Sequence, residues 1–109
     1  MLDPIADSLN RYMDALSFRQ KLVAANIANA DTPDYKTRDI DFQSELHAAG
    51  ATPGWIVEAQ GLPAKSDGNN VSLDREARLL AENALRFNMA SNLMKAQLRL
   101  VKAALQEGR

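Results

Sequence analysis

In the last third of the chain, mainly apolar residues recur at alternating steps of four and three positions. The pattern runs without a break from Leu73 to Leu105. This spacing is typical of the heptad seam of a helix that packs against another helix. Ser72 is suited to cap its start, and Gly108 follows its end. We therefore predict a long helix over residues 71–107. Its seam consists of Leu73, Ala77, Leu80, Ala84, Phe87, Ser91, Met94, Leu98, Val101 and Leu105.

A helix of this length does not fit inside a compact monomer. About 35 residues at roughly 1.5 Å each form a rod of about 50 Å. A compact chain of 109 residues has a diameter of roughly 34 Å. The molecule is therefore either elongated, with part of the seam unsupported, or its seam is covered by partner chains.

The N-terminal segment repeats the same spacing but skips one position near Arg19. Asp3 is placed to cap a helix whose first residue is Pro4, a position that favours proline. Pro33 ends the helix, because proline lacks the N–H group and restricts the residue before it. We predict a second helix over Pro4–Ala30, and hence a mainly α, elongated fold whose two long terminal helices pack as an antiparallel, coiled-coil-like hairpin. The apolar positions of this segment are Ile5, Leu9, Tyr12, Leu16, Val23, Ile27 and Ala30.

The middle of the chain, residues 48–70, is rich in loop-forming residues. It holds four of the five glycines and two of the four prolines. Trp55, Val57 and Ala59 alternate with other residues, which predicts a short strand or an extended arm. Trp55 itself is either an exposed interface anchor or a side chain folded back on the helices. The chain is thus one domain with three parts: 1–47, 48–70 and 71–109.

Charge and composition exclude several classes of protein. The 13 basic and 14 acidic residues nearly cancel, so neither nucleic acid nor an anionic membrane is an expected partner. Residues 1–47 carry five basic and eight acidic side chains, and residues 71–109 carry seven and four. These opposite net charges can attract each other within one chain or between copies. Cysteine is absent, which excludes disulfides and thiolate chemistry.

Two membrane-related signals are also missing from the sequence. No apolar run reaches the roughly 18 to 20 residues that span a bilayer, so the chain is not expected to cross a membrane. The segment after Lys21 imitates a signal peptide, but Asp3, Asp7 and Asp14 lie where its positive region should be. We therefore expect no cleaved signal.

The sequence offers no catalytic or metal-binding pattern. Residues 34–45 have the length of a calcium loop, but Lys36 and Arg38 occupy ligand positions. His47 is the only histidine and is expected to be ordinary surface. Asp39 and Asp41 are two residues apart, which does not bring their carboxylates together, so we expect a solvated acidic face. These features predict no enzyme, metal, cofactor or small-molecule substrate.

A polar stretch follows the first predicted helix and has the chemistry of a fixed bend. Asn26 and Asn29 can bond to nearby backbone groups and end the helix. Thr32 and Pro33 set a turn, and Tyr35 can bury its ring while its hydroxyl stays wet. We expect Asn26, Asn29, Thr32, Pro33 and Tyr35 to form a hinge.

This stretch, AANIANADTPDYKTRDIDF, resembles the N-terminal signature of bacterial flagellar rod and hook proteins, roughly Asn-Ile-Ala-Asn-x-x-Thr-Pro-Gly-Tyr/Phe. RDIDF at 38–42 and DGNNVSLDRE at 67–76 resemble the proximal rod proteins of the flagellar basal body in particular. The resemblance covers about residues 1–46 and 67–107. Asp34 replaces the usual glycine, and aspartate tolerates positive φ better than most residues. The middle is short for the family, so no large outer domain is expected.

The resemblance implies a structural subunit that polymerises through its terminal helices into the hollow drive shaft of the proximal rod, in the periplasmic part of the flagellar basal body. It implies contacts with further copies, other rod proteins and the basal-body adaptor or export gate. It also implies export by the flagellar type III apparatus without a cleaved signal peptide.

Packing and assembly are expected to depend on apolar side chains of both helices. A soluble helical adaptor or export chaperone that binds a partner helix in the same groove is the alternative function. The expected packing residues are Leu9, Leu16, Val23, Ile27, Leu80, Phe87, Met94, Leu98, Val101 and Leu105.

Overall fold

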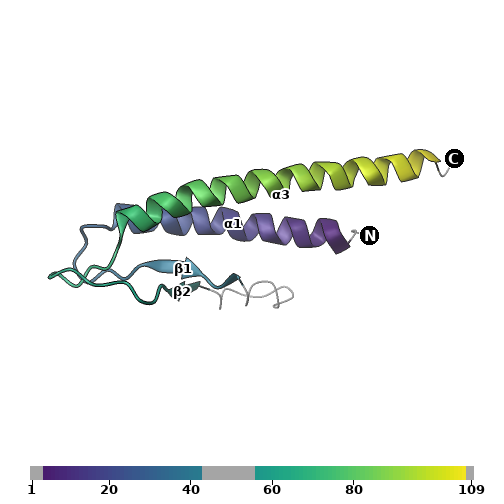
Figure 1. Cartoon of the computed structure of the whole chain (residues 1–109). Coiled ribbons are helices and arrows are strands. Elements are labelled where there is room, and N and C mark those ends of the chain that lie inside the picture. The colour runs from purple at the N-terminus through teal and green to yellow at the C-terminus, as the bar shows by residue number, and fades with distance from the viewer. Residues whose placement is uncertain (1–3, 43–55, 108–109) are drawn as a thin grey trace.

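The computed structural model of the chain describes residues 4–42 and 56–107, and within them it is an elongated helical hairpin. The elements in order are α1 (Pro4–Ala28), β1 (Arg38–Ile40), β2 (Ile56–Glu58) and α3 (Leu73–Glu107). The molecule measures 68 × 25 × 19 Å, with a radius of gyration of 17.8 Å (Figure 1). The mainly α, elongated fold that the periodicity predicts is therefore confirmed.

The two helices run antiparallel, as two polar contacts along their length demonstrate. Asn26 near the end of α1 bonds to Glu76 near the start of α3. Further along, Asn83 bonds to the carbonyl of Leu16. The 35 residues of α3 outnumber the 25 of α1, so the C-terminal end of α3 extends beyond the start of α1 (Figure 1).

A small antiparallel sheet lies alongside α1 (Figure 1). Arg38 of β1 is paired with Glu58 of β2, and Ile40 with Ile56. The side chain of Ile40 is buried, so β1 contributes to the core. The expected short strand around Val57 is present as β2, whereas Trp55 lies outside the described residues. β1 is an element that the sequence did not predict.

The helix ends agree with the expected caps within two residues. α1 ends at Ala28, two residues before the predicted Ala30, because Asn29 turns its side-chain amide onto the carbonyl of Ala25 at 2.8 Å. α3 begins at Leu73 because the hydroxyl of Ser72 accepts a bond from the N–H of Arg75. The expected cap Asp3, the surface residue His47 and the helix-ending Gly108 lie outside the described residues.

The core is narrow and lies on the inner side of α1. Among the described residues the buried apolar side chains come mostly from this helix, and α3 buries one alanine and two polar residues. The buried apolar side chains are Ala15, Leu16, Leu22, Val23, Ile40 and Ala90, and the buried residues of α3 are Glu76, Asn83 and Ala90.

Candidate functional site

Asn26 is the centre of a polar junction where the end of α1 meets the start of α3. Its side chain is buried and makes four hydrogen bonds. The amide nitrogen donates to Glu76 Oε1 at 2.7 Å and to the Arg38 carbonyl at 2.9 Å. The amide oxygen accepts from the Tyr35 hydroxyl at 2.9 Å and from the Arg38 N–H at 3.1 Å. Asn26 thus joins α1, β1 and α3 through one side chain.

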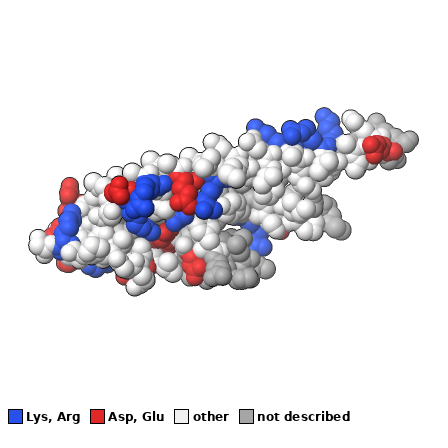
Figure 2. Space-filling model, in the orientation of Figure 1, with Lys and Arg blue, Asp and Glu red and all other residues white. Residues whose placement is uncertain are grey.

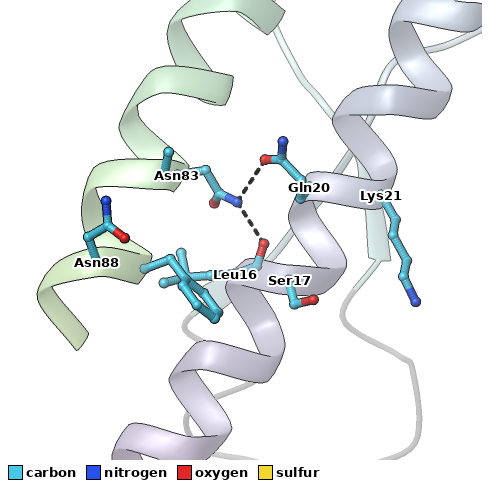
Figure 3. A pocket seen from close by; sticks show the side chains of 8 residues that line it. Leu16, Ser17, Gln20, Lys21, Asn83 and Asn88 are labelled. Atoms are coloured by element: carbon cyan, nitrogen blue, oxygen red, sulfur yellow. Dashed lines mark hydrogen bonds between the residues drawn. The ribbon is translucent and has the colours of Figure 1, made fainter. Parts of the chain in front are cut away.

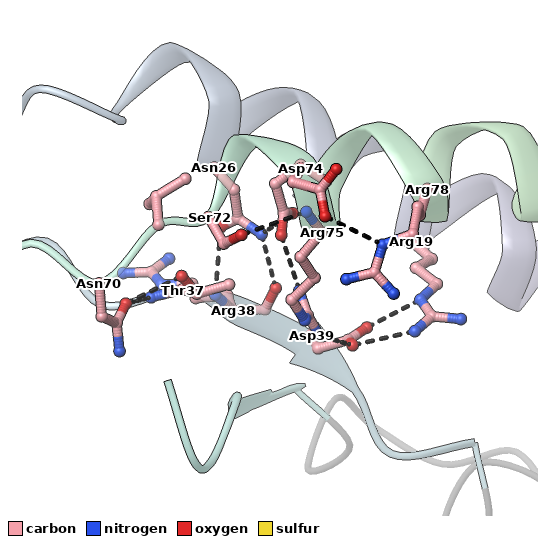
Figure 4. Close-up of polar contacts among 12 residues, drawn as sticks. Arg19, Asn26, Thr37, Arg38, Asp39, Asn70, Ser72, Asp74, Arg75 and Arg78 are labelled. Carbon is pink, nitrogen blue, oxygen red and sulfur yellow. Dashed lines mark hydrogen bonds and ion pairs between the residues drawn. The ribbon is translucent and has the colours of Figure 1, made fainter. Parts of the chain in front are cut away.

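An ion-pair chain continues the junction from Glu76 to α1. Glu76 is fully buried, and its second oxygen accepts from Arg75 at 2.7 Å. Arg75 also donates to Asp39 Oδ2 at 2.6 Å, and Arg19 donates to both Asp39 oxygens at 2.9 and 3.0 Å. Figure 4 shows Asp39 of β1 receiving these bonds beneath the two helices. We call Arg19, Asn26, Tyr35, Asp39, Arg75 and Glu76 the polar junction.

Asp39 contradicts the expectation of a solvated acidic face. Its side chain is buried, because β1 turns it toward the helices. Burial raises the pKa of this carboxyl, but the hydrogen bonds from Arg19, the Ile40 N–H and Arg75 together hold its pKa below the ordinary value. Asp39 therefore acts as a charged structural bridge between the strand and both helices.

The turn after α1 is held by a second, asparagine-rich loop that precedes α3. The amide of Asn69 donates to the carbonyls of Asn29 and Thr32, each at 2.8 Å. Asn70 accepts from both the N–H and the hydroxyl of Thr37. Asn69 is fully buried. The two sequence motifs of the resemblance therefore meet in space and satisfy each other's backbone groups.

Asp34 adopts the left-handed conformation expected of a residue in the position of a glycine. Its φ is 63°, and its N–H donates to the carbonyl of Asp67 at 2.9 Å. Gly68 also has positive φ, 86°, and a Cβ there would collide with the Asp34 side chain. The positive φ and the close approach of these loops thus both favour glycine at position 68.

The five residues expected at the hinge occupy two different environments. Asn26 is buried inside α1, and the half-buried Tyr35 bonds to it. Thr32 and Pro33 are exposed on the turn, where the Thr32 hydroxyl bonds to the half-buried Asn29. The structure brings all five to one end of the hairpin; their role as a hinge remains a prediction.

The packing residues expected from the periodicity also divide into two groups. Leu16 and Val23 of α1 are buried, and Leu9 and Met94 are half-buried. The remaining six are exposed in the single chain, with exposed fractions from 37% for Phe87 to 69% for Leu105. Each residue that α3 buries lies one position before a residue of the predicted seam, as Asn83 lies before Ala84. The seam therefore lies beside the contact with α1 and not within it. The exposed six are Ile27, Leu80, Phe87, Leu98, Val101 and Leu105.

A groove between the helices borders this exposed seam. It has a volume of about 470 Å³ and is lined by residues that include Leu16, Ala84 and Phe87. Figure 3 shows Asn83 reaching across from α3 to bond with the Leu16 carbonyl, at 2.7 Å, and with Gln20, at 3.1 Å. The Asn83 oxygen is buried and has no hydrogen-bond partner.

A second apolar face of α3 was missed by the sequence analysis. It lies on the other side of the contact with α1 and borders a groove of about 420 Å³ that Leu9 and Tyr12 also line. Leu85, Met89 and Leu93 are four residues apart and Leu100 follows seven residues later, a spacing that lies outside the predicted heptad seam. Its exposed members are Leu85, Met89, Leu93 and Leu100.

Sequence reasoning also missed most of the polar junction and its supporting loop. Glu76 and Asn83 occupy helical positions that ordinarily point to solvent, so nothing in the periodicity marks them as buried. The signal that could have found Asp39, Asn69 and Glu76 is their place in RDIDF and DGNNVSLDRE, the segments that carry the family resemblance.

Within residues 4–42 and 56–107, no group of three or more metal-binding side chains comes together. No helix in the same part of the chain is long and apolar enough to cross a membrane.

Comparisons with known proteins agree with the motifs at the junction. The family described as "Flagella basal body rod protein" matches residues 13–36, the second half of α1 and the turn. FlgB, the flagellar basal body rod protein of Escherichia coli (strain K12), is 34% identical, and the alignment covers 99% of each chain. FlgB of Proteus mirabilis (strain HI4320) is 33% identical over 99% of this chain and 100% of the relative. FlgB of Borrelia hermsii is 29% identical over 80% and 84%.

The alignment with the Escherichia coli protein spans 137 positions, more than the 109 residues of this chain. The chain is therefore shorter than this relative although it covers nearly all of it. Similarity over the full length, together with the signature at the junction, identifies the chain as a member of the flagellar basal body rod protein family that includes FlgB.

Proposed function

We propose that this chain is a structural subunit of the proximal rod of the bacterial flagellar basal body. The observation that carries the proposal is the uncovered apolar surface of α3 in a chain that belongs to the FlgB family. Leu98, Val101 and Leu105 are all more than a third exposed. They lie toward the C-terminal end of α3, which extends beyond the start of α1, so α1 does not cover them. Burying such surface between subunits contributes about 25 cal/mol per Å² of apolar area, and many such contacts would give a rigid shaft.

The finer assignments follow from the same proposal. The chain polymerises with further copies and with other rod proteins, and it contacts the adaptor or export gate at the base of the rod. It reaches the periplasmic rod by the flagellar type III apparatus without a cleaved signal peptide. The work of such a subunit is mechanical, and the proposal assigns it no catalysis and no cofactor. What supports these assignments is family membership together with an elongated hairpin whose apolar faces need partners.

The mutation Leu98→Asp tests the proposal. It places a charge in the exposed seam, where the side chain is 57% exposed in the single chain, so the isolated hairpin should still fold. We expect loss of motility and loss of the chain from purified basal bodies in the bacterium that makes it. Asn92→Asp is the matched control, because Asn92 is an exposed polar residue on the same helix. Motile cells with intact rods that contain the Leu98→Asp chain would contradict the proposal.

The alternative function, a soluble helical adaptor, is not favoured by the similarity to flagellar rod proteins, and an experiment on the purified chain distinguishes it from a rod subunit. An adaptor would fold completely on its own, whereas a rod subunit is expected to leave its helix ends disordered until it assembles. Circular dichroism and sedimentation of the purified chain at low concentration distinguish the two. Full helix content in a stable monomer at low concentration would favour the adaptor.

A further inference from the structure

Asp67 is followed by Gly68 in the loop before α3, and this pair has a reactivity that a structural role does not use. An aspartate forms a cyclic imide when the backbone nitrogen of the next residue attacks its side-chain carboxyl carbon. Glycine favours this attack, because it has no side chain to obstruct the nitrogen and its backbone rotates freely. Every other aspartate and asparagine of the sequence precedes a residue with a side chain. Asp67–Gly68 is therefore the position most open to this reaction.

The reaction reroutes the backbone without oxidation or reduction. The Gly68 nitrogen forms a bond to Asp67 Cγ, and its proton leaves with the carboxyl hydroxyl as water. Water then adds back and breaks either of the carbonyl–nitrogen bonds of the ring. If the original peptide bond breaks, the chain runs through the side chain of residue 67, and the former backbone carbonyl becomes a carboxylate. The product is an isoaspartate, which has the same mass and an additional carbon in the backbone.

The folded loop restrains each group that this reaction must move. The Gly68 N–H donates to the Lys65 carbonyl at 2.9 Å. The Asp67 carbonyl accepts from the Asp34 N–H, also at 2.9 Å. Both ends of the peptide group between Asp67 and Gly68 are thus bonded, which opposes the rotation that brings the nitrogen onto Cγ. Asp67 Oδ1 accepts from the Asn69 N–H at 3.0 Å, so the carboxylate is restrained as well.

Further bonds tie this peptide group to the turn after α1. Lys36 Nζ donates to the Gly68 carbonyl. The amide of the buried Asn69 donates to the carbonyls of Asn29 and Thr32. We call the bonds between residues 29–37 and 65–70 the loop contact. The peptide group is free to rotate only when the loop contact opens.

Burial does not explain this restraint, because Asp67 is exposed. Figure 2 shows acidic and basic side chains on the surface of the same end of the hairpin. Water therefore reaches the site in the folded chain as well as in the unfolded chain. What folding changes is the freedom of the reacting groups.

We propose that Asp67–Gly68 is a modification site of the unfolded chain, where isoaspartate forms until the loop contact closes and suppresses the reaction. The inference goes beyond the proposed function, because it concerns the chemistry of the chain before it folds. It assigns the loop contact a protective role in addition to its structural one.

An isoaspartate at position 67 would prevent the loop contact from closing. It removes the carbonyl of residue 67 from the backbone, so the Asp34 N–H loses its acceptor. The additional backbone carbon also displaces Asn69 from the carbonyls of Asn29 and Thr32, and these buried polar groups lose their partners. A chain modified before folding therefore forms an impaired hairpin, whereas a folded chain is protected.

Peptide mapping of the full chain, aged in native buffer and in guanidinium chloride, tests the inference. Trypsin releases residues 66–75, in which isoaspartate is recognised by a shift in retention and by labelling with an L-isoaspartyl methyltransferase. We expect it to accumulate at least about tenfold faster in guanidinium chloride, because the folded chain reacts only while the loop contact is open. Equal rates in the two conditions would overturn the inference. So would an unfolded chain that forms isoaspartate faster elsewhere than at Asp67.

Two variants separate the chemistry of the site from the restraint. Asp67→Glu keeps the charge but must close a larger ring, so the signal in residues 66–75 should disappear in both conditions. Asn69→Ala leaves Asp67 and Gly68 in place but removes the bonds to the turn after α1. It should react severalfold faster than the wild type in native buffer and at the same rate in guanidinium chloride. A helical Asn69→Ala chain, as judged by circular dichroism, that reacts no faster in native buffer would contradict the restraint.

The effect on the hairpin is measured on the aged chain itself. Wild type that has formed isoaspartate in guanidinium chloride is returned to native buffer and should then unfold at a lower denaturant concentration than fresh chain. Asp67→Glu aged in the same way should unfold like its own fresh sample. An unchanged midpoint in modified wild type would show that the loop contact tolerates isoaspartate and would overturn its protective value. The proposed function is decided separately by the motility of the Leu98→Asp strain.

Discussion

The junction end of the hairpin buries polar side chains, whereas the distal half, which consists of residues 4–14 of α1 and 89–107 of α3, leaves apolar side chains exposed. At the junction end, Asn26, Asn69 and Glu76 are buried and their side chains are bonded to groups from distant parts of the chain. In the distal half, Leu98 and Leu105 are exposed, and Lys95 and Lys102 form no ion pair with another described residue. At one end the chain satisfies its own polar groups, and at the other it leaves apolar side chains uncovered.

This difference separates folding from assembly within a small protein. A buried polar group is costly unless it is fully bonded, so the network at the junction favours one arrangement of α1, α3 and the two loops. Apolar seams are less specific and accept a partner helix from any chain of matching shape. The junction thus sets the geometry of the hairpin, and the distal half remains available for neighbours.

Asn26→Ala should produce the largest loss of stability in the isolated chain. It leaves Glu76 Oε1, the Tyr35 hydroxyl and both backbone groups of Arg38 without this partner. We expect a loss of about 3 kcal/mol in the free energy of unfolding, measured by urea denaturation. Leu105→Ala, in the exposed distal half, should change it by less than about 0.5 kcal/mol. Equal losses in the two variants would show that the two ends do not differ as described.

Gly68→Ala tests the close approach of the two loops at the junction. Alanine at this positive φ is strained, and its Cβ would collide with Asp34, so we expect a loss of about 2 kcal/mol. Gly61→Ala is the matched control, because Gly61 has a φ of 78° but open space around a Cβ. It should lose about 1 kcal/mol, the cost of the backbone conformation alone. Thermal denaturation of the two variants side by side measures the difference that the contact makes.

Asp39 makes the junction sensitive to acid. The pKa of Asp39 is lowered in the folded chain, so its contribution to stability is present above the unfolded pKa and is lost as pH falls through the folded pKa. Asp39→Asn should therefore cost about 1.5 kcal/mol at neutral pH. The difference from the wild type should shrink below about pH 4. Urea denaturation from pH 7 to pH 2 measures it, and a constant difference would mean that the charge of Asp39 does not matter.

The sequence was sufficient to predict the helices but not the residues that α3 buries. Periodicity located α1 and α3 within two residues because apolar spacing and caps are local properties. It placed the apolar seam at Ala84, Phe87 and their equivalents, whereas the chain buries Asn83 and Ala90. A periodic pattern indicates which face is apolar; it cannot tell whether the partner helix belongs to the same chain.

The polar junction was harder to predict for a different physical reason. Glu76 is buried only because Asn26 and Arg75 bond to it, and those residues come from separate elements. The burial of Asp39 depends likewise on β1, a strand of three residues without a propensity signal of its own. Long-range polar pairing of this kind has no period in the sequence, so only the family motif indicated that these segments were unusual.

Asp34→Gly should have the smallest effect of these substitutions. It tests whether the backbone of Asp34 is strained. Asp34 holds a φ of 63°, and glycine would adopt it without strain. Glycine also makes the unfolded chain more flexible, which costs about 0.4 to 1 kcal/mol and offsets the relief. We expect a net change below about 0.5 kcal/mol in the free energy of unfolding. The N–H of residue 34 would keep its bond to the Asp67 carbonyl.

Asp34→Ala is the matched control for this substitution. Alanine meets the same backbone strain without the local bonding that lets aspartate tolerate it, so a loss of about 1 kcal/mol is expected. If Asp34→Gly instead stabilised the chain by more than about 1 kcal/mol, the aspartate would be a source of strain at the junction. The junction end would then contain a strained residue in the isolated chain. The contrast between the two ends would be weaker than the hydrogen bonds indicate.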